Sequence, residues 1–359
     1  MAHTSRWHSA AGCLSPIPGL HPCLTLLLRF IFALSTLGSL AAVAPFAVTA
    51  RAQEITPESA PAPQSSPAPA PAAPTPAPAA GKGPALRVLA PADHMPAWLQ
   101  KQITTRTGAN VALDPYKTDE EALQKAMKAA PAYDLVAVSD RVASELIRAQ
   151  KLSPVTWPLN KDLVYNRYRG HYFDQENHFT LAYAVSLSGY AYKIADFPKP
   201  PNGWDDVLGS ADMAGIYWRP DPSWRLALLR HAGKSAETND ARLTAPPATT
   251  ARLVVDTIPE LCRRFARDSR NWKIVLPNNG SIITLYQVAI PVGAEHPREA
   301  LGAVQEIFTP RTMAALSMET LTAVTMPSAY KQLPAQFASH PLLYPSERAL
   351  DNSVFAKSK

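Results

Sequence analysis

The stretch between Leu86 and Asp140 constrains the fold more than any other part of the chain. Apolar runs typical of short strands alternate there with runs typical of helices. In chain order these runs are residues 86–90, 98–103, 107–111, 119–123 and 133–140. This β-α-β-α-β order predicts an α/β fold.

The same alternation continues to the C-terminal end of the sequence. Strands are expected at residues 179–185, 215–218, 272–276 and 287–290, and helices at 143–148, 204–208, 224–230 and 298–317. The chain has 359 residues, of which 47% are hydrophobic, enough for two lobes that each bury a core.

The N-terminal residues have the pattern of an export signal. Arg6 is the only charged residue before a leucine-rich run at 24–28, and an uncharged run extends from Phe30 to Ala50. The residues that follow fit a small-x-small cleavage site, which predicts a signal peptide over residues 1–52 and a periplasmic protein. The apolar run is also long enough to span a bilayer, so an uncleaved membrane anchor is the alternative.

Removing the signal would change the charge and the cysteine content. The formal charge of +6 includes three arginines and no acid from the first 52 residues, which leaves +3. This mild excess, without a basic block, predicts no binding to nucleic acid. Cys262 would be the remaining cysteine, and we interpret it as a structural helix residue.

Residues 53–85 form a Pro/Ala-rich tract. Ten of the 36 prolines lie between Pro57 and Pro84. Such a composition cannot bury a core and favours extended polyproline II geometry, so we predict a disordered, semi-rigid linker.

A set of short landmarks resembles one family of receptors. The landmarks are residues 133–136, 183–192, 204–208, 221–222, 276–280, 288–291 and 343–345. In order and spacing they are similar to the periplasmic spermidine/putrescine-binding proteins of ABC transporters, which are type II solute-binding proteins, and the resemblance covers most of residues 86–356.

The resemblance implies a two-lobe fold with hinge-crossing strands. Lobe 1 would hold residues 86–188 plus 285–326, and lobe 2 residues 189–284 plus 327–359, with crossings near Ser188, Thr284 and Met326. Such a protein would bind a small solute between the lobes, act as a monomer and deliver the solute to an inner-membrane ABC permease. The alternative is a degenerate receptor fold that acts as an envelope sensor or a protein-interaction module.

Most of the residues that hold a polyamine in that family are replaced. Polyamine ammonium groups need carboxylates, and the methylene chains need aromatic faces. Ser139 and Asp221 match ligand-contacting positions, but Trp224 and Tyr286 stand where the family has further acids. Losing two charge-assisted hydrogen bonds would weaken polyamine binding by about two to four decades. Trp224 has the alternative of packing in a core.

Three more residues belong to the predicted site. Asp93 and His94 replace an aromatic pair in the first loop, and Arg141 replaces an aromatic residue in the second. A guanidinium there would repel an ammonium group and suit a carboxylate or phosphate. The alternatives are that His94 is a surface histidine, and that Arg141 turns outward to pair with Asp140 or Glu145.

The sequence has no motif that predicts catalysis. It contains no Walker A loop, GxSxG, HExxH or GxGxxG pattern, so we predict no enzyme and no cofactor. His171 and His178 flank acidic residues at a spacing that fits no standard metal site, and we interpret them as loop residues. Related receptors for ferric ion use a tyrosine pair, but Tyr190 and Tyr192 are expected to point to opposite faces of their strand.

Overall fold

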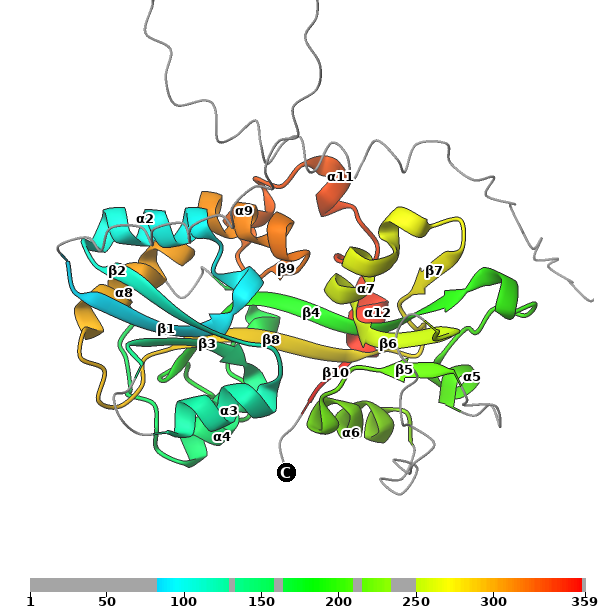
Figure 1. The fold of residues 1–359 in the computed structure, drawn as a ribbon, viewed down its shortest axis with the longest axis horizontal. Helices are drawn as coiled ribbons and strands as arrows, with labels where there is room; N and C mark the ends of the chain where they lie inside the picture. The colour runs from blue at the N-terminus through cyan, green and yellow to red at the C-terminus, as the bar shows by residue number, and fades with distance from the viewer. Residues whose placement is uncertain (1–82, 129–132, 158–163, 209–214, 234–249, 357–359) are drawn as a thin grey trace, which may run out of the picture. The chain divides into compact units, whose positions relative to one another are not determined.

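A sheet of ten strands runs through the computed structural model, which describes residues 83–128, 133–157, 164–208, 215–233 and 250–356 (Figure 1). The main path has the order β2-β1-β3-β8-β4-β6-β5, while β10 pairs with β8, and β7 and β9 pair with β4. The strands are β1 (Ala85–Pro91), β2 (Asn110–Tyr116), β3 (Leu135–Ser139), β4 (Thr180–Lys193), β5 (Ile216–Trp218), β6 (Leu253–Thr257), β7 (Trp272–Val275), β8 (Ile282–Ala289), β9 (Ala323–Val324) and β10 (Val354–Phe355).

The predicted signal peptide, residues 1–52, lies outside the described residues, and so does the predicted linker except for its last three residues. Ala85, the final residue of that linker, already belongs to β1. Within the described ranges, no helix is both long enough and apolar enough to span a bilayer.

Strand β4 pairs with two different sets of strands. Its first part, Thr180 to Leu187, pairs antiparallel with β8, and its second part, from Ser188 on, pairs antiparallel with β6 and β7. We call β1, β2, β3, β8 and the first part of β4 half one, and β5, β6, β7 and the second part of β4 half two. In half one β1 pairs parallel with β2 and β3, and in half two β5 pairs parallel with β6.

Helices cover both halves. Half one carries α2 (Ala97–Thr107), α3 (Asp119–Met127), α4 (Asp140–Arg148), α8 (Pro297–Ile307) and α9 (Pro310–Thr320), and half two carries α5 (Trp204–Leu208), α6 (Pro222–His231) and α7 (Ile258–Phe265). In half one α2 and α8 lie on the face of the sheet opposite to α3 and α4 (Figure 1). Cys262 is a buried free thiol in α7.

The single helix predicted over residues 298–317 is wrong, because the chain forms α8 and α9 there. Pro310 has no backbone N–H and therefore begins a helix more easily than it continues one. The Thr309 side chain accepts a hydrogen bond from the Thr312 N–H at 3.2 Å and caps the start of α9.

The C-terminal residues contact both halves. They contain the short helices α10 (Pro327–Tyr330), α11 (Ala335–Ala338) and α12 (Glu347–Asp351). The Tyr344 hydroxyl lies 3.3 Å from the Ser317 hydroxyl and accepts the Val324 N–H, so this part packs on α9 and β9 of half one. β10 then pairs with β8 at Ile282 and Ile283, and Ala356 belongs to the buried cluster of half two. The predicted lobe boundaries, residues 86–188 plus 285–326 and residues 189–284 plus 327–359, stay a prediction.

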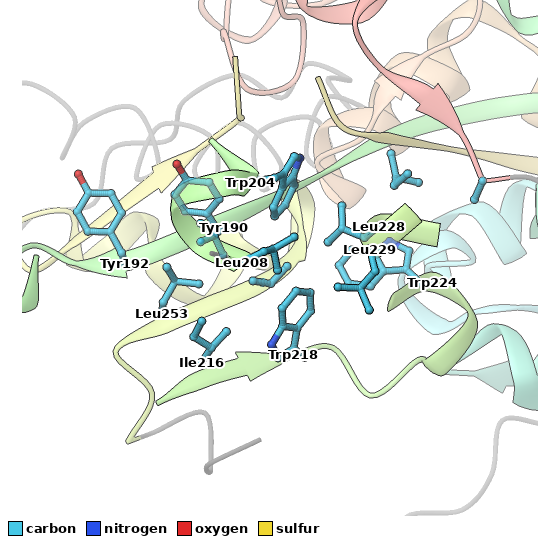
Figure 2. Packing of buried hydrophobic residues seen from close by; sticks show 14 residues of the cluster. Tyr190, Tyr192, Trp204, Leu208, Ile216, Trp218, Trp224, Leu228, Leu229 and Leu253 are labelled. Carbon is cyan, nitrogen blue, oxygen red and sulfur yellow. The ribbon is translucent and has the colours of Figure 1, made fainter. Parts of the chain in front are cut away.

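Half two is built around a tryptophan-rich core (Figure 2). Trp204 and Trp218 are almost fully buried there, and the Trp204 indole N–H donates to the Gly280 carbonyl at 3.0 Å. Tyr190 and Tyr192 belong to the same cluster with ring centres 6.5 Å apart. The expectation that these two tyrosines point to opposite faces is wrong, because residues two apart on a strand share one face.

Gly189 lies at the point where β4 changes partners, and it has no room for a side chain. An added Cβ would lie 2.6 Å from the Val275 carbonyl oxygen and 2.5 Å from the Ile258 Cδ1 atom. Because a backbone carbonyl held in a strand ladder cannot move easily, we expect Gly189→Ala to lower the free energy of unfolding by about 1–3 kcal/mol. Urea unfolding would measure this. Gly203→Ala, where the new atom meets only the Asn279 side chain at 3.2 Å, should cost less, and equal costs would contradict the explanation.

Candidate functional site

The carboxyl ends of the parallel strands in the two halves approach one another along β4. Ser139, at the end of β3, pairs with Tyr286 of β8, which in turn pairs with Ala184. Thr257, at the end of β6, pairs with Ser188. Ala184 and Ser188 are four residues apart on one strand, about 13 Å. Open α/β sheets bind ligands at the carboxyl ends of their strands, so this region is the candidate site.

Arg141 joins the two halves through an ion-pair cluster. Its guanidinium donates to the Asp119 Oδ2 atom at 2.6 and 3.1 Å, and to the Asp221 Oδ1 atom of half two at 3.4 Å. The Asp119 backbone N–H donates to the Asp221 Oδ2 atom, also at 3.4 Å. The Ser139 hydroxyl completes the cluster by donating to Asp119 Oδ2 at 2.7 Å. One cation therefore lies between two carboxylates, one from each half.

Helix N-caps determine where these charged groups lie. Ser139 accepts the Val142 N–H and caps α4, which puts Arg141 in the first turn of that helix. Asp221 accepts the Trp224 N–H at 3.2 Å and caps α6 just before a proline at the first helical position. Asp119 is the first residue of α3, so all three helices begin at the cluster.

Asp93 forms a second polar contact between the halves. It lies in the 3-10 turn η1 (Ala92–His94) after β1, and its carboxylate pairs with the guanidinium of Arg263 from α7. Arg263 also donates to the Thr320 carbonyl of half one at 2.8 Å. Half two is therefore held to half one by two arginines, one contributed by each half.

His94 lies in an aromatic cluster. Its Nδ1 atom is 2.6 Å from the Tyr183 hydroxyl, and its ring centre is 4.3 Å from that of Tyr286. The side chain is buried, so the alternative of a surface histidine is wrong. Burial is the main cause that lowers the pKa of His94 to about 4, so the ring is neutral at pH 7.

The other predicted site residues are placed as follows. Arg141 pairs with neither Asp140 nor Glu145, so the outward-facing alternative is wrong. Trp224 is 4% exposed and packs in the core of half two, where its indole N–H has no hydrogen-bond partner among the described residues (Figure 2). A ligand contact by Trp224, as by the other site residues, stays a prediction.

Sequence reasoning missed three charged residues of the site. Asp119 follows β2, Arg219 follows β5, and Asp256 lies near the end of β6. The Arg219 guanidinium is 3.9 Å from the Asp256 carboxylate. Burial raises the pKa of Asp256 to about 6 against the effect of this arginine. For Arg219 the available signal was its position directly after the strand predicted at residues 215–218, because strand ends in α/β sheets carry ligand contacts. No strand was predicted over β6, so the sequence offered no such signal for Asp256.

Comparisons with known proteins identify the class of fold. No protein-family model and no curated protein matches the sequence. Among solved structures, a spermidine/putrescine ABC transporter protein from Listeria monocytogenes is 19% identical, with a TM-score of 0.67 over 76% of this chain and 92% of that one. The spermidine/putrescine substrate-binding protein of Streptococcus pneumoniae is 16% identical, with a TM-score of 0.64 over 77% and 94%. Iron-bound HitA from Pseudomonas aeruginosa is 14% identical, with a TM-score of 0.56 over 68% and 87%.

The chain therefore has the α/β fold of the type II solute-binding proteins, with strands that cross between two halves. The fold class and the resemblance to polyamine receptors predicted from sequence are confirmed as a likeness of fold. The similar structures include proteins described as binding polyamines, iron or maltose, so the fold alone does not name a ligand.

The buried neutral His94 should make stability depend on pH. The unfolded chain binds a proton at this histidine near pH 6.5, whereas the folded protein does not until about pH 4. The unfolded state therefore holds more protons in this window, and stability falls as the pH falls, by on the order of 3 kcal/mol. Urea unfolding at pH 7 and pH 4 should show a smaller loss for His94→Gln than for the unchanged protein.

Asp140 also contributes to the pH dependence of stability, so the effect of His94 is measured as a difference between the His94→Gln variant and the unchanged protein. Burial raises the pKa of this carboxyl to about 8, so its contribution to stability increases as the pH falls. That opposite contribution is present in both proteins and cancels in the difference. His178→Gln, a change at an exposed histidine, should leave the pH profile as it was. Parallel profiles for His94→Gln and the unchanged protein would contradict the assignment.

Proposed function

We propose that the protein is an extracytoplasmic solute-binding protein that captures a small solute between its two halves and presents it to an ABC permease. The observation that carries this proposal is the meeting of Asp119, Arg141 and Asp221 from opposite halves at the carboxyl ends of the strands. Residues from opposite halves come into contact when the halves close over a ligand, so such a contact can distinguish the closed, ligand-bound form. The likeness of fold to solute-binding proteins and the predicted export signal support the same function.

A polyamine held in the usual way fits this site poorly. Asp221 is the clamp carboxylate that matches the polyamine receptors, and Arg141 already pairs with it. An ammonium group would have to displace a guanidinium whose side chain is only 14% exposed. The proposed ligand is therefore a small solute whose binding does not require an ion pair with Asp221.

The second candidate is an envelope sensor or interaction module that no longer transports a solute. The observation that favours it is that the protein bridges its own halves at two places, through Arg141 and through Arg263. If the closed form is already populated without a ligand, ligand binding shifts the equilibrium between open and closed forms less.

A thermal-shift panel separates the two candidates. Polyamines, amino acids, organic acids and phosphates would each be added to the purified protein. A ligand at about 100 times its dissociation constant adds about 2.7 kcal/mol of stability, which is several degrees in melting temperature at this size. A shift accompanied by a smaller radius of gyration in solution scattering supports the receptor. The absence of any response, together with a protein partner, supports the sensor.

Asp221→Asn should weaken the contact between the halves. Asparagine caps a helix as well as aspartate does, so α6 should persist, while the ion pair with Arg141 is lost. The side chains of Arg141 and Asp221 are only 14% and 2% exposed, so losing this pair should cost at least the roughly 1 kcal/mol of a surface ion pair, which corresponds to about fivefold or more open protein. Distances between spin labels at Lys101→Cys and Arg270→Cys would measure the open population.

The control for this experiment is Asp206→Asn, which removes the same charge from an exposed position in α5. It should leave the label distances unchanged. If Asp221→Asn and Asp206→Asn give the same distance distribution, the ion-pair cluster does not hold the halves together.

A further inference from the structure

The guanidinium of Arg219 has hydrogen-bonding capacity that the protein leaves unused. Its guanidinium lies 3.9 Å from the Asp256 carboxylate, which is longer than a hydrogen bond, and its side chain is only 21% exposed. Among the described residues, this guanidinium makes no hydrogen bond, although the Arg219 backbone N–H donates to the Val255 carbonyl at 3.1 Å. A guanidinium carries five N–H donors in a planar fork.

The neighbouring carboxylates do not have the same deficit. Asp119 and Asp221 share the guanidinium of Arg141, and Asp256 accepts the Thr257 N–H at 2.8 Å. At Arg219 itself the unmet demand is for hydrogen-bond acceptors. Its donors are largely shielded from water, so a molecule that supplies acceptors can form charge-assisted hydrogen bonds here.

Arg219 remains charged in this position. Burial disfavours the cation, but Asp256 is the first of several neighbours that together raise the pKa of Arg219 above its ordinary value. The guanidinium carbon lies 6.0 Å from the ring centre of Trp224, within the range of a cation–π contact. Trp224 thus belongs to the core and also supports the arginine.

We propose that Arg219 anchors an oxyanion group of the solute, a carboxylate or a phosphate, through its unused N–H donors. This inference rests on the proposed function as a solute-binding protein. The planar fork of a guanidinium matches two oxygens of a carboxylate or phosphate in parallel hydrogen bonds. An ammonium group of a polyamine would instead meet a positive charge at the same place, and would supply donors where acceptors are lacking.

Calorimetric titration of the purified protein would test this with stated probes. Acetate and succinate represent carboxylates, inorganic phosphate and sulfate represent tetrahedral oxyanions, and putrescine and spermidine represent cations, all at one ionic strength. We expect at least one oxyanion to bind and both polyamines to fail. Arg219→Gln should weaken that binding by about tenfold to a hundredfold, as the loss of a charge-assisted hydrogen bond predicts.

Arg264→Gln is the matched control. Arg264 lies 3.7 Å from the other oxygen of Asp256, but its guanidinium already donates to Glu260 at 2.7 Å. The variant removes the same charge beside the same carboxylate, and it should change the affinity far less than Arg219→Gln. Arg219→Lys keeps the charge without the fork and should give an intermediate affinity.

A second measurement uses the unchanged protein, so it does not depend on whether a variant folds. In the unchanged protein, the nuclear magnetic resonance signal of the Arg219 Nε–Hε group should shift when the bound oxyanion is added. Binding of an oxyanion with that signal unmoved would overturn the assignment to Arg219. Binding of a polyamine or a neutral solute alone would overturn the oxyanion inference and leave the proposed function standing. If no member of this panel or of the thermal-shift panel binds, both proposals fail.

Discussion

The continuity of β4 is the constraint on which the rest of the structure depends. One strand carries the ladder to β8 as far as Leu187 and the ladders to β6 and β7 from Ser188 on. The register of these ladders fixes how far apart the strand ends of the two halves lie. Gly189 permits the change of partners, because any side chain there would collide with the Val275 carbonyl. The position of the candidate site therefore follows from the pairing of the backbone strands, independently of the charged side chains.

Most charged side chains of the site form ion pairs with one another. In the polyamine receptors that the sequence resembles, the cation belongs to the ligand and the carboxylates to the protein. Here Arg141 supplies a cation to Asp119 and Asp221, and Arg263 supplies one to Asp93. Arg141 and Asp93, which differ from the residues expected of a polyamine receptor, thus make contacts between the halves. Arg219 lies 3.9 Å from the Asp256 carboxylate and makes no side-chain hydrogen bond among the described residues.

The fold could be predicted from sequence because strand-to-helix alternation and helix caps are local signals. Ser139 and Asp221 each occupy the cap position that their residue type favours, whereas the prediction of one helix over residues 298–317 missed the cap at Thr309. The site could be predicted only in part. The resemblance to a family points to positions where a residue is replaced, such as Arg141, but Arg219 matches none of the family positions named above. Whether a guanidinium has acceptors is a property of tertiary packing, which no sequence pattern reports.

The likeness to proteins described as polyamine, iron and maltose binders shows how little the fold decides about the ligand. In this chain the scaffold brings two sets of strand ends together, and the side chains at those ends decide what can bind. For this chain the deciding quantity is the balance of donors and acceptors near the crossing strands. Asp119 and Asp221 share the guanidinium of Arg141, while the guanidinium of Arg219 makes no hydrogen bond among the described residues. The Arg219 side chain is only 21% exposed and its guanidinium has no hydrogen-bond partner among the described residues, so its free donors are the main physical argument for an acceptor-bearing solute.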